Sequence, residues 1–418
     1  MADVENGKKE AYESSYDKTT SPTDSDLVPA TIATPVAAVP LQDGGMRAWL
    51  QVLGSFLVFS NLWGFVFAFG SFQSFYQLDY LSDQTPSDIS WIGTIATGLL
   101  IFVGILSGPL FDLGYFRSML IVGGLGLLYL PGLALVGRSF KKHRSMAMAL
   151  TTCGAPVGGI IYTLMFQQLI TRIGFAWTIR AMGFFMLGSY LISFPLLLWG
   201  VTNLGDIATG SRRKMFDSAA LRDLPFWSYS FSNFFIFTGY MVPFIFISAY
   251  GQSRLGLSQS TALNMIIAAQ ASSILGRLVA GYAASRIGAM IPWIVSAMAS
   301  GAVCLAWIGV RTEGAFIAIA CLYGCFSGPL IPLPPSVFPL VCPDVRVLGA
   351  RLGMAQAIGS IASLIGAPIA GALLTTGGGG NNYTALQLFG GLVMIAGGFQ
   401  LIGLYILLAR RRDVGKFF

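Results

Sequence analysis

Arg277 is difficult to reconcile with its surroundings, because it lies inside an apolar run at about 260–284. A guanidinium in hydrocarbon is costly, so it should face the interior of a helix bundle and meet an anion, a backbone carbonyl or a polar neighbour. The alternative is a residue near a helix end that extends to lipid headgroups. We favour the first interpretation, which makes Arg277 the main candidate for contact with a ligand.

Other side chains within the apolar runs could also bind a ligand. Amides and hydroxyls offer hydrogen bonds, and aromatic rings offer faces for stacking. The candidates are Asn61, Phe67, Tyr240, Asn264 and Gln270. If such residues line one cavity, they favour a large, mostly apolar ligand held by stacking and a few hydrogen bonds. The alternative is that they pack against helices and lipid, or hydrogen-bond between helices.

The apolar runs contain no cluster of serine, histidine, aspartate or metal ligands, so we expect neither an enzyme nor a metal or cofactor site. His143 is the single histidine, and the five cysteines show no Cys-x-x-Cys spacing. An ATP-driven pump would need a glycine-rich phosphate loop, and the sequence does not contain this motif. The net charge of +7 comes from short basic clusters beside apolar runs, which argues against nucleic acid as a partner and for membrane lipid.

The composition predicts an all-α integral membrane protein. Hydrophobic residues make up 55% of the 418 residues and charged residues only 10%, against about a quarter charged in soluble domains. The apolar runs are near the roughly 20 residues that cross a bilayer as a helix, and they lack the alternation of barrel strands. We count eleven spans, at about 48–75, 89–110, 118–137, 146–168, 177–202, 226–250, 260–284, 288–310, 314–340, 349–375 and 384–409.

Polar segments divide the chain into two helix bundles. Basic loops on one side of the spans indicate that both termini are cytosolic in a multi-pass protein, which we expect in the plasma membrane. The predicted organisation is a disordered cytosolic tail at 1–42, an N-terminal bundle at 43–204, a cytosolic linker at 205–225, a C-terminal bundle at 226–410 and a cytosolic tail at 411–418.

Several motifs resemble the major facilitator superfamily. Residues 108–114 (Gly-Pro-Leu-Phe-Asp-Leu-Gly) and 281–288 are similar to the loops that follow its second and eighth helices. Residues 43–49 and 140–144 more narrowly resemble the entries to helices one and five in its monocarboxylate porter branch, especially the fungal members. The resemblance covers nearly the whole chain from Asp43. It implies a two-bundle fold that moves a small organic solute by alternating access.

The resemblance also implies a cytosolic gate. Its candidate residues are Gly108, Asp112, Arg117 and Arg286, in which Asp112 near a helix end could pair with a cation or cap neighbouring amides. A simple interfacial turn is the alternative for this motif. On the opposite side, Asn382 begins an Asn-Tyr-Thr glycosylation sequon.

The third apolar run departs from the family pattern. The segments at 112–117 and 138–144 both read as cytosolic, yet only about 20 residues lie between them, enough for one crossing. The stretch 119–124 resembles the start of helix three and 127–140 the end of helix four. We hypothesise that a deletion fuses these helices, through a splice variant or a mistaken gene model, and we expect poor folding or a re-entrant segment.

A second departure concerns the chemistry of the branch. Its proton-coupled porters resemble one another in a helix-one lysine and a helix-eight Asp-x-x-x-Arg pair. The matching positions here are Phe67, Ser273 and Arg277, so only the arginine remains. Because no Asp or Glu lies in the middle of a predicted span, lactate-proton symport is disfavoured, although a proton stays the candidate coupling ion.

The function that we predict is secondary transport of a small organic solute, either monocarboxylate-like or a hydrophobic metabolite, with efflux as one direction. A second class of function is a membrane sensor that binds a solute without moving it, or an inactive truncated isoform. Flux into proteoliposomes distinguishes these possibilities, since binding without flux indicates a sensor.

Overall fold

Long apolar helices make up most of the described chain, which the computed structural model covers at residues 44–112, 115–122, 125–140, 143–200, 217–342, 344, 347–376 and 382–410. Within these residues, nine helical segments are long and apolar enough to cross a membrane. The predicted tails at 1–42 and 411–418, and residues 205–216 of the predicted linker, lie outside the described residues.

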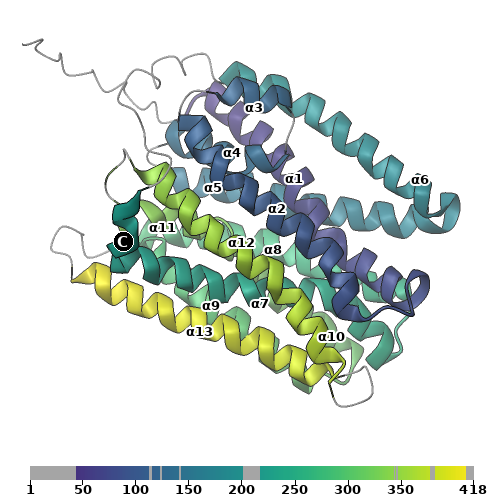
Figure 1. The fold of residues 1–418 in the computed structure, drawn as a ribbon. Coiled ribbons are helices and arrows are strands. Elements are labelled where there is room, and N and C mark those ends of the chain that lie inside the picture. Colours follow the sequence, from purple (N-terminus) through teal and green to yellow (C-terminus); the bar gives the residue numbers. More distant parts are fainter. Residues whose placement is uncertain are drawn as a thin grey trace, which may run out of the picture. The chain divides into compact units, whose positions relative to one another are not determined.

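Figure 1 shows the helices, coloured in the order in which they follow one another along the chain. In chain order they are α1 (Met46–Phe75), η2 (Tyr76–Tyr80), α2 (Pro86–Asp112), α3 (Phe116–Val122), α4 (Leu125–Ser139), α5 (Arg144–Thr152), α6 (Gly154–Gly200), η4 (Ser218–Arg222), α7 (Leu224–Leu255), α8 (Gln259–Ile287), α9 (Met290–Ala306), η5 (Trp307–Gly309), α10 (Glu313–Ser327), η6 (Gly328–Leu330), α11 (Leu333–Val341), α12 (Leu348–Leu374) and α13 (Tyr383–Ala409). Continuous apolar stretches join α5 to α6 and α10 to α11.

A reversal at Gly174 divides α6 into two spans. The 47 residues of α6 would be about 70 Å long as one straight helix, more than twice the hydrocarbon thickness. Gly174 has φ 73° and ψ 170°, a conformation that glycine adopts without a steric penalty. Figure 1 shows α6 turning back at this end, where the Phe175 ring lies 5.7 Å from that of Phe75. The separate spans expected at 146–168 and 177–202 are therefore both present.

The helix α4 covers only half the depth of α1. Its 15 residues are about 22 Å long. At its start, the Tyr129 ring lies 5.7 Å from the Trp63 ring in the middle of α1. At its end, the Ser139 carbonyl accepts a hydrogen bond from the Gly44 amide, 3.4 Å away, just before α1 begins. The helix α4 therefore runs antiparallel to the first half of α1.

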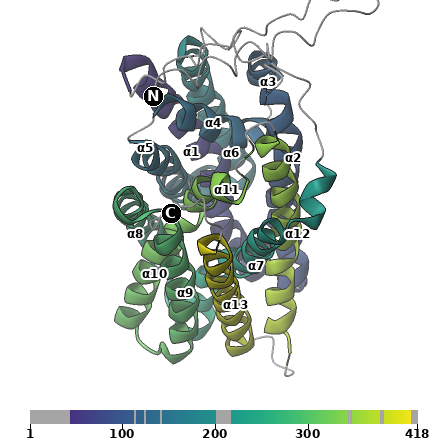
Figure 2. The same ribbon diagram turned by 90° about the vertical axis from the view of Figure 1, so that its left-hand side faces the viewer.

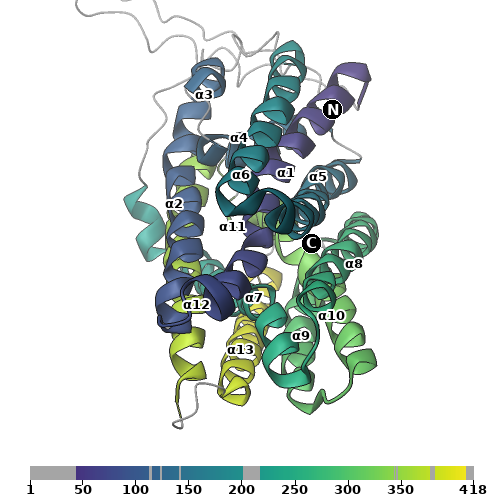
Figure 3. The same ribbon diagram turned by 90° about the vertical axis from the view of Figure 1, so that its right-hand side faces the viewer.

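The segment α3–α4 enters and leaves the bundle at the same end. A hydrogen bond of 3.2 Å from Gln73 Nε2 to the Pro86 carbonyl joins the end of α1 to the start of α2, so α2 returns to the end where α1 begins. Figure 3 shows α3 at that same end. The stretch expected to span at 118–137 is instead a re-entrant pair of short helices, because its chain is too short to cross twice.

The two halves of the chain pack through corresponding helices. The helix α2 lies along α12, while α5 and α6 lie against α8 (Figures 1 and 2). The helix α1 also packs against α7. This exchange of contacts between second and fifth spans is typical of two repeats related by an axis along the membrane normal. It places α1, α7, α8 and α10 around the centre of the molecule.

Candidate functional site

Arg277 is fully buried at the centre of the bundle, although it carries a charge. Its Nε donates a hydrogen bond of 3.0 Å to the Gly328 carbonyl, and its guanidinium lies 5.9 Å from the centroid of the Phe67 ring. Within the described residues, Nη1 and Nη2 have no hydrogen-bond partner. The side chain therefore does not extend to lipid headgroups, and its unused donors remain at the centre of the molecule.

A proline explains why the Gly328 carbonyl can accept this bond. The helix α10 ends at Ser327, and the chain continues through η6 before α11 begins at Leu333. In an α-helix the carbonyl of Gly328 would accept from the amide of residue 332, but Pro332 has no N–H. The break between α10 and α11 thus frees a carbonyl, and Arg277 from α8 satisfies it.

Aromatic rings from α1 and α7 cover the guanidinium. The centroids of Phe67 and Phe244 lie 5.1 Å apart, and those of Phe67 and Tyr240 lie 6.2 Å apart. The Tyr240 hydroxyl is close enough to Arg277 to interact electrostatically, but makes no hydrogen bond of standard geometry within the described residues. Tyr323 of α10 holds this part of α7 by donating a bond of 2.6 Å to the Tyr240 carbonyl.

Gln270 lies on the same face of α8 as Arg277, two turns earlier. It is fully buried, and neither Nε2 nor Oε1 has a hydrogen-bond partner within the described residues. A Cβ built on Gly159 would lie 3.2 Å from both Gln270 Cδ and Phe67 Cβ, so these side chains meet at that glycine. The Ser273 hydroxyl between them is likewise buried and unpartnered in the described chain.

We call Phe67, Tyr240, Gln270 and Arg277 the central cluster. Each buried polar atom without a partner costs about 1–3 kcal/mol, so several such atoms in one place are unfavourable unless a solute or water binds them. Among the described residues, ion pairs with a carboxylate are found for Arg351 but not for Arg277. Together with the neighbouring Ser273 hydroxyl, the central cluster therefore provides a cation, two amide atoms and two hydroxyls beside apolar rings.

Two of the predicted ligand contacts lie elsewhere. Asn61 already uses its amide, because its Oδ1 accepts bonds from Tyr162 (2.8 Å) and Ser189 (2.9 Å), and its Nδ2 donates to the Met186 carbonyl (3.3 Å). It joins helices within the first half of the chain. Asn264 is exposed on α8, away from the central cluster. The structure therefore brings Phe67, Tyr240, Gln270 and Arg277 together and leaves these two asparagines apart.

The described structure does not test the predicted gate residues as a group. Gly108 and Asp112 belong to the last turns of α2, but their side chains lie outside what is described. Arg117 on α3 is exposed. Arg286 is exposed at the end of α8, with its guanidinium 5.3 Å from the Tyr282 ring. The gate therefore remains a prediction.

Asn382, the predicted glycosylation residue, forms the N-cap of α13. Its Oδ1 accepts from the Ala385 amide at 3.2 Å, and its Nδ2 donates to Thr376 Oγ1 at 3.0 Å. A glycan on Nδ2 would replace one of the two hydrogens of this nitrogen. Modification of the sequon stays a prediction.

Contacts between the two halves close the central cluster on both sides. Toward the end of α1, Gln252 Nε2 donates a bond of 2.6 Å to Ser74 Oγ. Toward the opposite face, Gln356 Nε2 of α12 donates a bond of 3.2 Å to the Tyr129 hydroxyl of α4. Hydrogen bonds between the two halves thus lie on both sides of the cluster, whose four residues are buried.

Two ion pairs at the start of α12, which we call the clamp, were not predicted from the sequence. Arg351 Nε lies 2.7 Å from Asp217 Oδ2, and Arg351 Nη1 lies 2.8 Å from Asp223 Oδ2. The clamp ties the two ends of η4 to α12. No local pattern indicates this pairing, because the arginine and the two acids are far apart in sequence.

Two groups of membrane helices around a buried, cation-bearing centre are typical of secondary transporters. Residues 116–346 match the family model of the Major Facilitator Superfamily. The chain belongs to this superfamily of membrane transporters, which confirms the predicted fold class, the multi-pass membrane location and the prediction that the chain is not an enzyme.

Fungal transporters are similar over most of the chain. The MFS-type transporter dbaD of Emericella nidulans is 30% identical, over 85% of this chain and 86% of its own. The aspyridones efflux protein apdF of the same organism is 32% identical, over 87% of this chain and 79% of its own. The agnestins efflux protein AgnL12 of Paecilomyces divaricatus is 31% identical, over 87% of both chains.

Solved structures share the fold at low identity. The human organic anion transporter MFSD10 (TETRAN) is 15% identical, with a TM-score of 0.55 over 85% of this chain and 98% of its own. The transporter FucP in its outward conformation is 16% identical, with a TM-score of 0.52 over 86% of this chain and 98% of its own.

The alignment with dbaD also indicates missing residues. It extends over 387 positions but covers 85% of the 418 residues, about 355, so about 30 positions have no residue in this chain. That is about one crossing helix and a connection. A deletion of this size in helices three and four stays a prediction.

Proposed function

We propose that the chain exports an organic metabolite that combines an apolar body with an anionic group. The observation that carries this proposal is Arg277, a buried cation with two unpartnered nitrogens beside the rings of Phe67 and Tyr240. A carboxylate can accept two parallel bonds from Nη1 and Nη2 and neutralise the charge. The rings offer stacking surface for the remainder of the solute.

Export as the direction is supported by relatives, two of which are named for the efflux of aspyridones and of agnestins. We place the chain in the monocarboxylate porter branch on the motifs at 43–49 and 140–144. The loss of the lysine and aspartate positions, now Phe67 and Ser273, supports a bulkier and more apolar solute than lactate.

Alternating access in this proposal is a relative movement of residues 43–204 against residues 226–410. The contacts on the two sides of the central cluster would break in turn, with Gln252–Ser74 opening one face and Gln356–Tyr129 the other. We further propose a proton as the coupling ion and the plasma membrane as the location. Flux with and without an imposed pH gradient, and fractionation of cell membranes, check these two points.

Flux from proteoliposomes of an aromatic carboxylate and of its neutral methyl ester tests the role of Arg277. For Arg277→Gln, we expect carboxylate flux to fall by about 10–100-fold, the value of a bond to a charged group, with a much smaller change for the ester. Arg311→Gln is the matched control, because Arg311 bonds only local carbonyls, those of Ile308 and Val310, among its described contacts.

Equal carboxylate flux by the wild type and Arg277→Gln would remove Arg277 from the site.

The shortened α3–α4 region also motivates the alternative functions. Binding of the carboxylate without flux would identify a sensor, and neither binding nor flux would identify an inactive product.

A further inference from the structure

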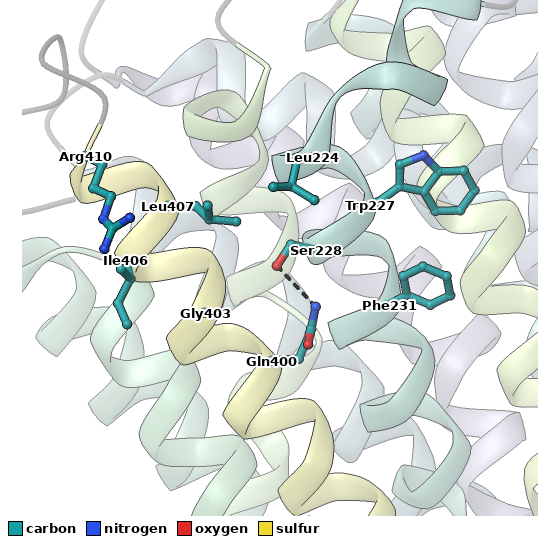
Figure 4. Close-up of a pocket in the computed structure, with 9 residues that line it drawn as sticks. All are labelled: Leu224, Trp227, Ser228, Phe231, Gln400, Gly403, Ile406, Leu407 and Arg410. Atoms are coloured by element: carbon teal, nitrogen blue, oxygen red, sulfur yellow. Dashed lines mark hydrogen bonds between the residues drawn. The ribbon is translucent and has the colours of Figure 1, made fainter.

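A pocket of about 420 Å³ lies between the start of α7 and the end of α13 (Figure 4). It is separate from the central cluster. Its lining residues come from one face of each helix, and they are Leu224, Trp227, Ser228, Phe231, Gln400, Gly403, Ile406, Leu407 and Arg410. The spacing of the α7 residues, at steps of three and four, places them along a single stripe.

The pocket exists because α7 and α13 are in close contact deeper in the bundle but separate near their ends. At the deeper level, a Cβ on Gly397 would lie 2.6 Å from Ile236 Cγ1 of α7. At the level of the pocket, a Cβ on Gly403 would meet no atom within 4 Å. The missing side chain at Gly403 therefore leaves the space open.

The pocket is amphipathic along its length. Figure 4 shows Arg410 at one end and the Ser228–Gln400 pair further along, where Gln400 Nε2 donates to Ser228 Oγ at 3.4 Å. The side chains of Leu224 (63% exposed), Phe231 (44%) and Ile406 (47%) form apolar walls that open to the surface. Such exposed apolar walls on membrane helices face lipid.

Position and charge indicate what occupies this pocket. The distribution of basic residues places the end of α13 on the cytosolic side of the membrane, and the sequence continues from Arg410 with Arg411 and Arg412. From Arg410 to Gln400 is about 15 Å along a helix. This equals half of a hydrocarbon core about 30 Å thick, the depth of one leaflet.

We propose that this pocket binds an anionic phospholipid of the cytosolic leaflet. The headgroup phosphate lies at Arg410, and one acyl chain lies over Gly403 between Phe231 and Leu407. Basic pockets between membrane helices on the cytosolic side recognise anionic headgroups by this combination of charge and apolar depth. The proposal does not depend on the transported solute, because the pocket and the central cluster share no residue.

Native mass spectrometry tests the proposal. It measures how much lipid the full chain retains after purification from nanodiscs. The probes are phosphatidylserine and phosphatidylcholine with identical acyl chains. The wild type should prefer phosphatidylserine by about fivefold, the value of one arginine near an anionic surface. Gly403→Leu fills the pocket and should abolish retention of both lipids, while Arg410→Gln should abolish only the preference.

Gly188→Leu is the matched control on α6, because a Cβ there also meets no atom within 4 Å. It should leave retention unchanged. Full retention of lipid by Gly403→Leu would contradict lipid binding in this pocket. Equal retention of both lipids by the wild type would contradict the preference for an anionic headgroup. Should Gly403→Leu fail to fold, the exposed Arg410→Gln variant still decides the charge, and competition by the transported carboxylate would assign the pocket to solute instead.

Discussion

The two halves of the molecule differ most at their third and fourth helices. In the second half, α9 and the pair α10–α11 are full-length apolar segments. In the first half, the same places hold α3 and α4, with 7 and 15 residues. The first half therefore keeps the helical structure near the end where α1 begins and lacks the parts that would lie toward the end of α1.

The difference shows what the additional helix depth contributes. In the second half, α10 supports the central cluster, because Tyr323 donates to the Tyr240 carbonyl and Gly328 accepts from Arg277. In the first half, α4 reaches only to Trp63, and its Tyr129 makes the contact to α12 through Gln356. The chemistry of the central cluster thus depends mainly on the complete half.

An all-or-none test of this comparison asks on which side of the membrane the connections around α3–α4 and between α9 and α10 lie. We expect Tyr115→Cys and His143→Cys, on the two sides of α3–α4, to react with an impermeant thiol reagent only after cells are permeabilised. Glu313→Cys, at the α9–α10 connection, should react from outside. All three positions are exposed, so access decides labelling. Reaction of either first-half variant in intact cells would mean that α3–α4 crosses the membrane.

Close glycine contacts give a smaller, graded test. A Cβ on Gly158 would overlap the Ser60 carbonyl in the first half, and one on Gly276 would overlap the Cys325 carbonyl in the second. We expect Gly276→Ala to lower the free energy of unfolding by about 1–3 kcal/mol. Gly158→Ala should cost less, because helices with less support can move apart more easily.

Thermal unfolding in detergent measures this difference, with Gly188→Ala as the control that meets no atom. A larger loss of stability for Gly158→Ala than for Gly276→Ala would contradict the idea that the first half yields more readily.

The smallest expected effect concerns the contact of α4 with the second half. Tyr129→Phe removes one hydrogen bond, from Gln356 Nε2 to the hydroxyl. We expect a loss of about 1 kcal/mol in the free energy of unfolding, measured by the same thermal method. Tyr282→Phe is the control, since Tyr282 is exposed. No change for Tyr129→Phe would mean that α4 contributes nothing to the closure between halves.

Hydropathy and charge were sufficient to predict the helices, because the cost of exposing a polar backbone to lipid leaves few alternatives. The burial of Arg277 followed from the same physics. Its partner did not, although the proline four residues after Gly328 marks a carbonyl without a helical donor. Such a proline identifies a carbonyl that is free to accept a hydrogen bond, but it does not predict which side chain donates that bond.

Two amide side chains show which property of a helix the sequence does not predict. Asn61 and Gln270 are both amides inside apolar helices, yet Asn61 bonds to neighbouring helices and Gln270 lies unpartnered in the central cluster. The rotation of each helix about its own axis decides this, and rotation depends on packing against distant parts of the chain. The length of the third apolar run predicted a topological conflict with a re-entrant segment as one outcome, but its division into α3 and α4 did not follow from the sequence.

The re-entrant pair has a consequence for how such a chain can arise. Because α3–α4 begins and ends on one side, every later helix keeps the orientation that it would have after two complete crossings. A change in the length of this hairpin can therefore leave the orientation of the rest of the protein in the bilayer unchanged. Chains with a long or a short hairpin would therefore insert into the membrane with the same orientation of α5 and all later helices.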